Sequence, residues 1–255
     1  MKAFLFLLLS AAYLLISQGG RVRIIDGDEV LPHSKPYMAL IEFETEHYEI
    51  ICGGSLIRRN WVLTAAHCQM FQSTVTVTLG AHSRVKKEMD KQMFDVVRSI
   101  KHPHYNSSNY NNDLRLLKLH RKAKLGKAVQ LMSLPETFED TEAGTVCQAA
   151  GWGLTEDGDN SDNLMEVNVT LIERGKCQRS WKNKVNITEN MMCTSVGPKG
   201  QDTCEGDSGG PLICNGVLKG ITSFGNIKCG HPGDTSVFTR LTKEYVTWIL
   251  NTIND

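Results

Sequence analysis

The sequence has no excess of either charge, and it lacks internal repeats, low-complexity segments and long apolar runs beyond its first residues. Its 28 basic residues balance 28 acidic residues over 255 positions. Balanced charge gives no reason to expect nucleic acid or an acidic membrane as a partner. The absence of a later apolar run excludes a transmembrane candidate there. What remains is an ordinary globular composition, of a length that suits one large all-β domain or two small ones.

The first residues have the form of a secretory signal peptide. Lys2 precedes an apolar run from Phe4 to Ile16, which is too short to span a membrane. We expect the signal peptide at residues 1–19 and a mature chain that is secreted or enters a secretory compartment. Because Lys2, Arg21 and Arg23 leave with the leader, the mature chain is slightly acidic.

The cysteine pattern favours disulfides over a metal site. The chain has eight cysteines, and no two of them have the Cys-x-x-Cys spacing of a zinc knuckle or a redox motif. In a secreted chain such a set is typical of a disulfide framework. Spacing alone leaves the pairing open.

Most of the chain reads as short strands separated by turn residues. The residues at 74–79 alternate with period two, and further strand-like segments lie at 94–97, 114–119, 164–172 and 237–239. The exception is the segment from Thr242 to Ile253, in which one helical face carries Tyr245, Trp248, Ile249 and Ile253. Many short strands with one terminal helix indicate an all-β barrel or sandwich.

Three separate segments carry residues suited to acyl transfer. Ser208 lies in the run Gly206-Asp207-Ser208-Gly209-Gly210, where glycines allow a tight turn that presents the hydroxyl beside free backbone amides. A serine needs a histidine base and an orienting carboxylate to become a nucleophile. His67 stands beside a cysteine, and Asp113 precedes an apolar run. The order along the chain is His, Asp, Ser.

With these three segments and its eight cysteines, the sequence resembles the chymotrypsin-like serine proteases. The resemblance implies two six-stranded antiparallel β-barrels with a C-terminal α-helix and an active site in the cleft between the barrels. His67 and Asp113 would belong to the first barrel, and Ser208 to the second. It also implies four disulfides: Cys52 with Cys68, Cys147 with Cys214, Cys177 with Cys193, and Cys204 with Cys229.

The same resemblance assigns a role to each member of the triad. Ser208 would attack the scissile carbonyl, His67 would transfer the proton, and Asp113 would hold the imidazole in one tautomer. The backbone amides of Gly206 and Ser208 would form the oxyanion hole. Taken alone, each residue also has an ordinary structural explanation, so the prediction rests on the combination.

An activation step is implied at the N-terminus of the mature chain. In the resembling family, cleavage at the bond that matches Arg23–Ile24 frees an amine, which here would pair with Asp207. A buried carboxylate without a partner is costly, so this pair would hold the loop around Ser208 in its active shape. We therefore expect a propeptide at residues 20–23, a protease domain at 24–255 and an inactive uncut chain.

Asp202 is the expected floor of the primary specificity pocket, because it lies six residues before Ser208. A buried carboxylate there would select Arg or Lys at the cleaved bond. Ser236 stands where the family usually has glycine, and its side chain would narrow the pocket, favouring one basic residue or lowering activity. The other residues expected to bind substrate are Thr203, Glu205, Ser223, Phe224 and Gly225. Of these, Glu205 would repel acidic residues near the scissile bond.

Three segments, 33–39, 79–83 and 222–225, are most similar to those of the granzymes of cytotoxic lymphocytes. Together with Asp202, they resemble the tryptase-type granzymes A and K. The resemblance implies storage in a cytotoxic granule and serpin-type inhibitors as partners. Granzyme A forms a disulfide-linked dimer through an extra cysteine, and the corresponding loop of this chain, at 102–106, has none. We therefore expect a monomer. Ala81 stands where a trypsin-type calcium loop has its first acidic ligand, so we expect no metal, and no cofactor is implied.

Two surface features complete the predictions. A basic cluster would suit a sulfated proteoglycan or be an ordinary solvated loop face; it comprises Lys118, His120, Arg121, Lys122, Lys124 and Lys127. Three glycosylation acceptors occur, of which we expect at least one to be used, at Asn106, Asn168 and Asn186.

Two hypotheses compete with the granule protease. One is another trypsin-like extracellular protease of the mast-cell or digestive type. The other is a catalytically silent homologue that acts by binding. An intact triad, Asp202 and a cleavable bond after Arg23 argue against the silent homologue.

Overall fold

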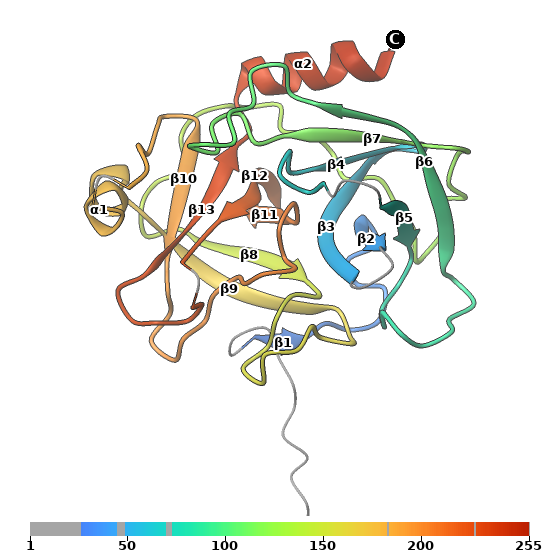
Figure 1. The fold of residues 1–255 in the computed structure, drawn as a ribbon, viewed down its shortest axis with the longest axis horizontal. Coiled ribbons are helices and arrows are strands. Elements are labelled where there is room, and N and C mark those ends of the chain that lie inside the picture. The colour runs from blue at the N-terminus through green and yellow to red at the C-terminus, as the bar shows by residue number, and fades with distance from the viewer. Residues whose placement is uncertain (1–26, 45–48, 70–72, 183, 227, 255) are drawn as a thin grey trace, which may run out of the picture.

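Two closed antiparallel β-barrels of six strands each form the body of the protein (Figure 1). This computed structural model describes residues 27–44, 49–69, 73–182, 184–226 and 228–254. The expected signal peptide, the propeptide and the bond between Arg23 and Ile24 lie outside the described residues. The barrel architecture expected from the resemblance is confirmed.

The first barrel closes in the order β2, β3, β4, β7, β6, β5. Its strands are β2 (Met38–Glu44), β3 (Glu49–Arg58), β4 (Trp61–Thr64), β5 (Thr74–Leu79), β6 (Gln92–Lys101) and β7 (Arg115–Leu119). The expected strand at 74–79 has the same bounds as β5. β4, which leads to the segment of His67, is buried along its whole length.

The second barrel contains β8 (Val146–Gly151), β9 (Met165–Ile172), β10 (Met191–Ser195), β11 (Pro211–Cys214), β12 (Val217–Phe224) and β13 (Thr235–Arg240). A pairing between β8 and β9 closes it, and the short β1 (Asp28–Glu29) pairs with the first residues of β9. β9 alternates as a barrel strand should, since Met165, Val167, Val169 and Leu171 are buried in the barrel core.

Two helices accompany the barrels in the described part of the chain. The expected C-terminal helix is α2 (Lys243–Asn254), whose Tyr245 and Ile249 are buried with the core of the first barrel. Burying each such side chain contributes about 1.5–3 kcal/mol. A second helix, α1 (Arg174–Ser180), was not predicted from the sequence. It has seven residues, of which only Cys177 is buried, so its sequence carries no apolar periodicity that would have predicted it.

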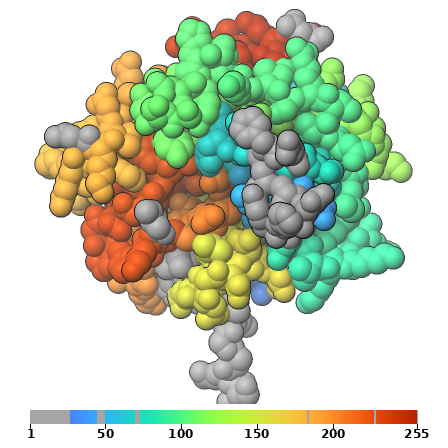
Figure 2. All heavy atoms as spheres, in the orientation of Figure 1, coloured from blue at the N-terminus to red at the C-terminus, as the bar shows by residue number. Residues whose placement is uncertain are grey.

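The barrels touch through glycines next to Ser208. A Cβ built on Gly53 of β3 would lie 3.0 Å from the Cα of Gly210, which precedes β11. The amide of Gly53 donates to the carbonyl oxygen of Ser208 at 2.7 Å. Segments of the first half (cyan and green) and the second half (yellow to red) meet on the face shown in Figure 2. Close backbone contact therefore places the loop of Ser208 against the first barrel.

Candidate active site

His67 and Asp113 are joined by two hydrogen bonds. The backbone amide of His67 donates to Asp113 Oδ1 at 2.9 Å, and its ring Nδ1 lies 2.7 Å from Asp113 Oδ2. Asp113 is completely buried. Because the carboxylate only accepts hydrogen bonds, it holds the proton on Nδ1 and leaves the lone pair of Nε2 free to accept a proton.

Asp113 has a further donor that the sequence did not reveal. The hydroxyl of Ser223, expected only to bind substrate, donates to Asp113 Oδ2 at 2.5 Å. The two residues are 110 positions apart, so no local pattern could have indicated the contact. Ser223 therefore links the end of β12 to the carboxylate that orients His67.

Two side chains support the backbone on either side of this pair. The buried guanidinium of Arg115 donates to the carbonyl oxygen of Ala66, immediately before His67. Burial lowers the pKa of Arg115, while the negative charge of Asp113 opposes this effect. On the other side, the hydroxyl of Tyr245 in α2 donates to Asn112 Oδ1 at 2.7 Å. In the sequence, the only indication of a special role for Arg115 is that it is a charged residue within an apolar run.

Ser208 lies beside the segment that precedes His67. Cys68 Sγ is 3.5 Å from the carbonyl oxygen of Ser208. A Cβ on Gly209 would lie 2.0 Å from Thr64 Oγ1, and the φ of Gly209 is +78°, so this position requires glycine. Within the described residues no hydrogen bond joins the hydroxyl of Ser208 to the imidazole. The structure thus brings the segments of the predicted triad together.

The predicted oxyanion hole lies in the same turn. Gly206 has φ +94°, and a Cβ there would lie 2.7 Å from the Cα of Gly153. The amide of Leu154 donates to the carbonyl oxygen of Glu205 at 2.7 Å, and the side chain of Glu205 is exposed. In the described part of the chain, the amides of Gly206 and Ser208 donate to no protein acceptor, so both are available to a ligand.

Asp207 is a buried carboxyl group without a cationic partner among the described residues. Its oxygens accept the amides of Cys204 and Gly153, each at 2.9 Å. Burial raises the pKa of Asp207 to about 7, against the effect of these two hydrogen bonds. Gly151 and Gly153 have no room for a Cβ, since either would collide with this carboxyl group. The expected partner, the amine of Ile24, lies outside the described residues.

Asp202 is buried at the predicted pocket floor and accepts three hydrogen bonds. The donors are the amide of Thr203 at 2.9 Å, the hydroxyl of Ser236 at 2.6 Å and the amide of Gly230 at 3.2 Å. Burial raises the pKa of Asp202, and these donors oppose the rise. Thr203 and Ser236 are themselves buried.

Phe224 belongs to an aromatic cluster that the sequence did not indicate. Its ring centroid is 4.9 Å from that of Tyr110 and 5.1 Å from that of Trp181. Tyr110 also meets the ring of His67 edge to face at 5.9 Å. Gly225 follows at the end of β12, and a Cβ there would lie 3.2 Å from the hydroxyl oxygen of Ser236. The cluster connects the predicted substrate strand to the predicted base.

The four disulfides join the pairs that the resemblance implied, and the described chain has no free cysteine. Two of them border the site. The bridge between Cys52 and Cys68 lies next to His67, and the bridge between Cys204 and Cys229 ties the loop of Asp202 to the segment after β12.

The loop that begins at Ala81 and resembles a trypsin-type calcium loop contains the ammonium group of Lys91. Lys91 Nζ donates to the carbonyl oxygens of Arg84 at 3.2 Å and Lys86 at 2.5 Å. Glu88 accepts two backbone amides of the same loop. No group of three or more His, Cys, Asp or Glu side chains suited to a metal ion occurs in the described part of the chain.

The remaining predicted surface features are accessible. Asn106, Asn168 and Asn186 are all exposed. In the basic cluster, Arg121 stacks on Phe94 with its guanidinium carbon 4.3 Å from the ring centroid. The other exposed members are His120, Lys122, Lys124 and Lys127, and Lys118 is half-buried.

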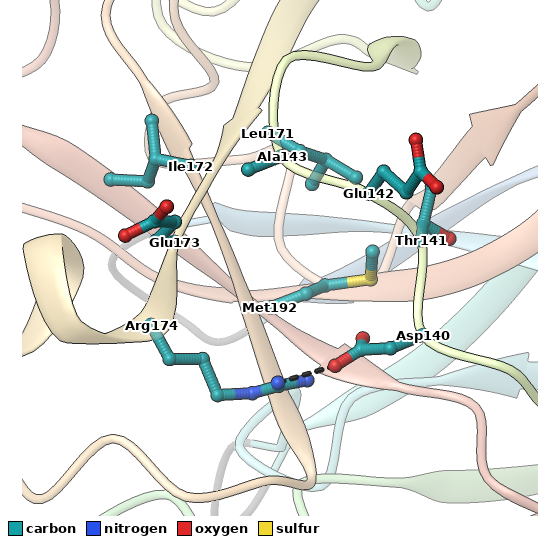
Figure 3. Close-up of a pocket in the computed structure, with 9 residues that line it drawn as sticks. All are labelled: Asp140, Thr141, Glu142, Ala143, Leu171, Ile172, Glu173, Arg174 and Met192. Atoms are coloured by element: carbon teal, nitrogen blue, oxygen red, sulfur yellow. Dashed lines mark hydrogen bonds and ion pairs between the residues drawn. The ribbon is translucent and has the colours of Figure 1, made fainter.

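A cavity of about 330 Å³ lies outside the predicted site, beside β9 and the N-terminal end of α1 (Figure 3). Arg174 extends across it and pairs with Asp140. The other residues that line it are Thr141, Glu142, Ala143, Leu171, Ile172, Glu173 and Met192. None of them is a predicted site residue.

Among the described helices, none has the length and apolar character needed to cross a membrane.

Comparison with known proteins agrees with this geometry. The Trypsin family matches residues 24–249. Granzyme A of Bos taurus is 43% identical, with 90% of this chain and 88% of granzyme A covered. Mast cell protease 3 of Ovis aries is 41% identical, with 98% and 96% covered. The solved structure of neuropsin, a serine protease expressed in the limbic system of mouse brain, matches with a TM-score of 0.79 and 37% identity, covering 89% of this chain and 99% of neuropsin. The chain belongs to the trypsin family of serine proteases.

Proposed function

We propose that the chain is a secreted serine endopeptidase, made as an inactive precursor, that cleaves peptide bonds after Arg or Lys. One observation carries the proposal: distant segments converge where the barrels touch. His67 is hydrogen-bonded to the buried Asp113, and the loop of Ser208 packs against the residues before His67. This arrangement suits nucleophilic attack assisted by a general base.

In the proposed mechanism, Ser208 Oγ attacks the scissile carbonyl while His67 Nε2 takes its proton. His67 then returns the proton to the leaving amine, and Asp113 keeps the imidazole oriented throughout. The amides of Gly206 and Ser208 receive the negative charge on the carbonyl oxygen. One such donor is worth about 3 kcal/mol of transition-state stabilisation.

The proposed activation depends on Asp207. Cleavage after Arg23 would free the amine of Ile24, which would pair with the carboxylate of Asp207. The buried position of this carboxyl group and its raised pKa support the proposal, because an added positive charge would stabilise the ionised form. The pair would then hold the turn between Gly206 and Ser208 in its active shape.

We further propose that the enzyme is a monomer located in a secretory granule or outside the cell. Resemblance to granzyme A and to mast cell protease 3 supports this location. A serpin-type inhibitor is the proposed regulator, and the basic cluster from Lys118 to Lys127 is the proposed contact for a sulfated proteoglycan. At least one of Asn106, Asn168 and Asn186 would carry a glycan.

The test is hydrolysis of peptide thioesters that differ only in the residue before the cleaved bond. Protein with a free Ile24 is compared with a Ser208→Ala variant on Arg, Lys, Phe and Asp substrates. The proposal expects cleavage after Arg or Lys that the variant abolishes. Cleavage after Phe or Asp alone would contradict the specificity, and no turnover by processed protein would favour the silent, binding homologue.

A further inference from the structure

Ser236 lies directly beside Asp202 at the floor of the predicted specificity pocket. Ser236 Oγ lies 2.6 Å from Asp202 Oδ1. The same oxygen is 3.2 Å from the position of a Cβ on Gly225. Asp202 and Ser236 are each only 3% exposed. The hydroxymethyl group of Ser236 therefore reaches from β13 to the carboxylate, beside Gly225 at the end of β12, and occupies the predicted pocket floor.

The hydrogen bonds leave the two oxygens of Asp202 unequal. A carboxylate oxygen accepts about two hydrogen bonds. Oδ1 already accepts the amide of Thr203 and the hydroxyl of Ser236. Among the described residues, Oδ2 accepts only the amide of Gly230, at 3.2 Å. The carboxylate therefore has one open acceptor position, on Oδ2, whereas the hydroxyl oxygen of Ser236 keeps its own lone pairs.

The two basic side chains need different acceptors. A guanidinium group binds a carboxylate best through two parallel hydrogen bonds, which require a free position on each oxygen. An ammonium group is compact and has three donors that can go to separate oxygens. Here it can donate to Asp202 Oδ2 and to Ser236 Oγ without displacing any existing hydrogen bond.

From this geometry, and resting on the proposed function, we infer that Ser236 makes the enzyme selective for Lys over Arg at the cleaved bond. Its hydroxyl takes the second acceptor position on Asp202 Oδ1 and itself accepts from the lysine ammonium. Its side chain also takes the space that the wider guanidinium plane would need. Ser236 is thus a specificity-determining residue that acts on the substrate side chain directly and through Asp202.

The main test measures kcat/KM on matched Lys and Arg peptides with processed enzyme. Wild type is expected to favour Lys by about tenfold or more, the effect of one charged hydrogen bond. Ser236→Gly frees one acceptor position on Oδ1 and the space at the predicted pocket floor, so the ratio should move toward Arg by at least that factor. Ser236→Ala, which removes only the hydroxyl, should give an intermediate ratio. Ser133→Gly, at an exposed loop position, is the control and should keep the wild-type ratio.

A second measurement does not depend on catalysis. Calorimetry with Ser208→Ala protein processed to a free Ile24 compares butylammonium with butylguanidinium as ligands. Tighter binding of the ammonium ion, reversed by adding Ser236→Gly, is the expected result. This arm also covers the case in which the Ser236 variants fold poorly, because the preference is first measured with Ser236 intact.

The outcomes separate the two proposals. Preference for Arg or equal use of both residues by the wild type overturns the inference and leaves the proposed function standing. An unchanged ratio in Ser236→Gly also overturns it. Absence of turnover together with tighter ammonium binding contradicts the proposed function and supports the assignment of Ser236.

Discussion

Replacement of Asp207 by asparagine should remove a pH dependence from the stability of the precursor. In the uncut chain this carboxyl group is buried, and its pKa is raised from 3.8 to about 7. Because the folded pKa lies above the unfolded value, the stability from this group is complete below about pH 4. It is lost as the pH rises through 7. Ionised Asp207 therefore destabilises the uncut chain at neutral pH.

The magnitude follows from the size of the shift. A change of about three pKa units corresponds to about 4 kcal/mol in the free energy of unfolding, lost between about pH 4 and pH 8. The asparagine of the Asp207→Asn variant could not titrate. It would cost stability at every pH, because its amide group would face one of the two backbone amides that Asp207 accepts. The difference in slope is therefore the informative quantity.

The assay is urea unfolding of the uncut chain at several pH values, with Asp207→Asn compared in a Ser208→Ala background that prevents self-cleavage. Other titrating groups cancel in the comparison. The precursor should lose about 4 kcal/mol more than the variant between about pH 4 and pH 8. Processed protein with a free Ile24 should lose less, because the amine would stabilise the ionised carboxylate. Equal slopes for precursor and variant would refute the reasoning.

Three further predictions concern residues around the site. Ser223→Ala removes a donor from Asp113, so kcat/KM should fall about tenfold with the fold retained. Tyr245→Phe removes the hydrogen bond to Asn112, and urea unfolding should reveal a loss of about 1 kcal/mol. Chelation of calcium should leave the Tm unchanged, because the ammonium group of Lys91 already binds the carbonyl oxygens of the loop that resembles a calcium loop. Lys91→Met removes these hydrogen bonds and should lower the free energy of unfolding by about 1 kcal/mol.

Full activity of Ser223→Ala would mean that Asp113 needs no donor from β12. A Tyr245→Phe variant as stable as wild type would mean that the hydrogen bond between α2 and Asn112 contributes nothing to the stability of the fold. A fall in Tm on adding EDTA would reveal a bound metal ion that contributes to stability.

The sequence was informative where a pattern is local. The period-two alternation at 74–79 predicted β5 with its bounds, and the apolar face of the terminal segment predicted α2. The glycine-rich turn around Ser208 carries its own conformational requirement, because Gly206 and Gly209 adopt positive φ. Such features depend on neighbouring residues, so they can be read without knowing the fold. α1 was missed because a disulfide, rather than an apolar stripe, anchors it.

Only the tertiary structure decided which distant side chains meet. Ser223 reaches Asp113 across 110 positions, and Ser236 reaches Asp202 across 34. These contacts depend on how β12 and β13 are registered and on how closely the glycines let the two barrels approach. The sequence by itself determined the residues capable of the chemistry. Their hydrogen-bond partners, the raised pKa of Asp207 and the unequal oxygens of Asp202 follow from burial and strand register, which no short segment encodes.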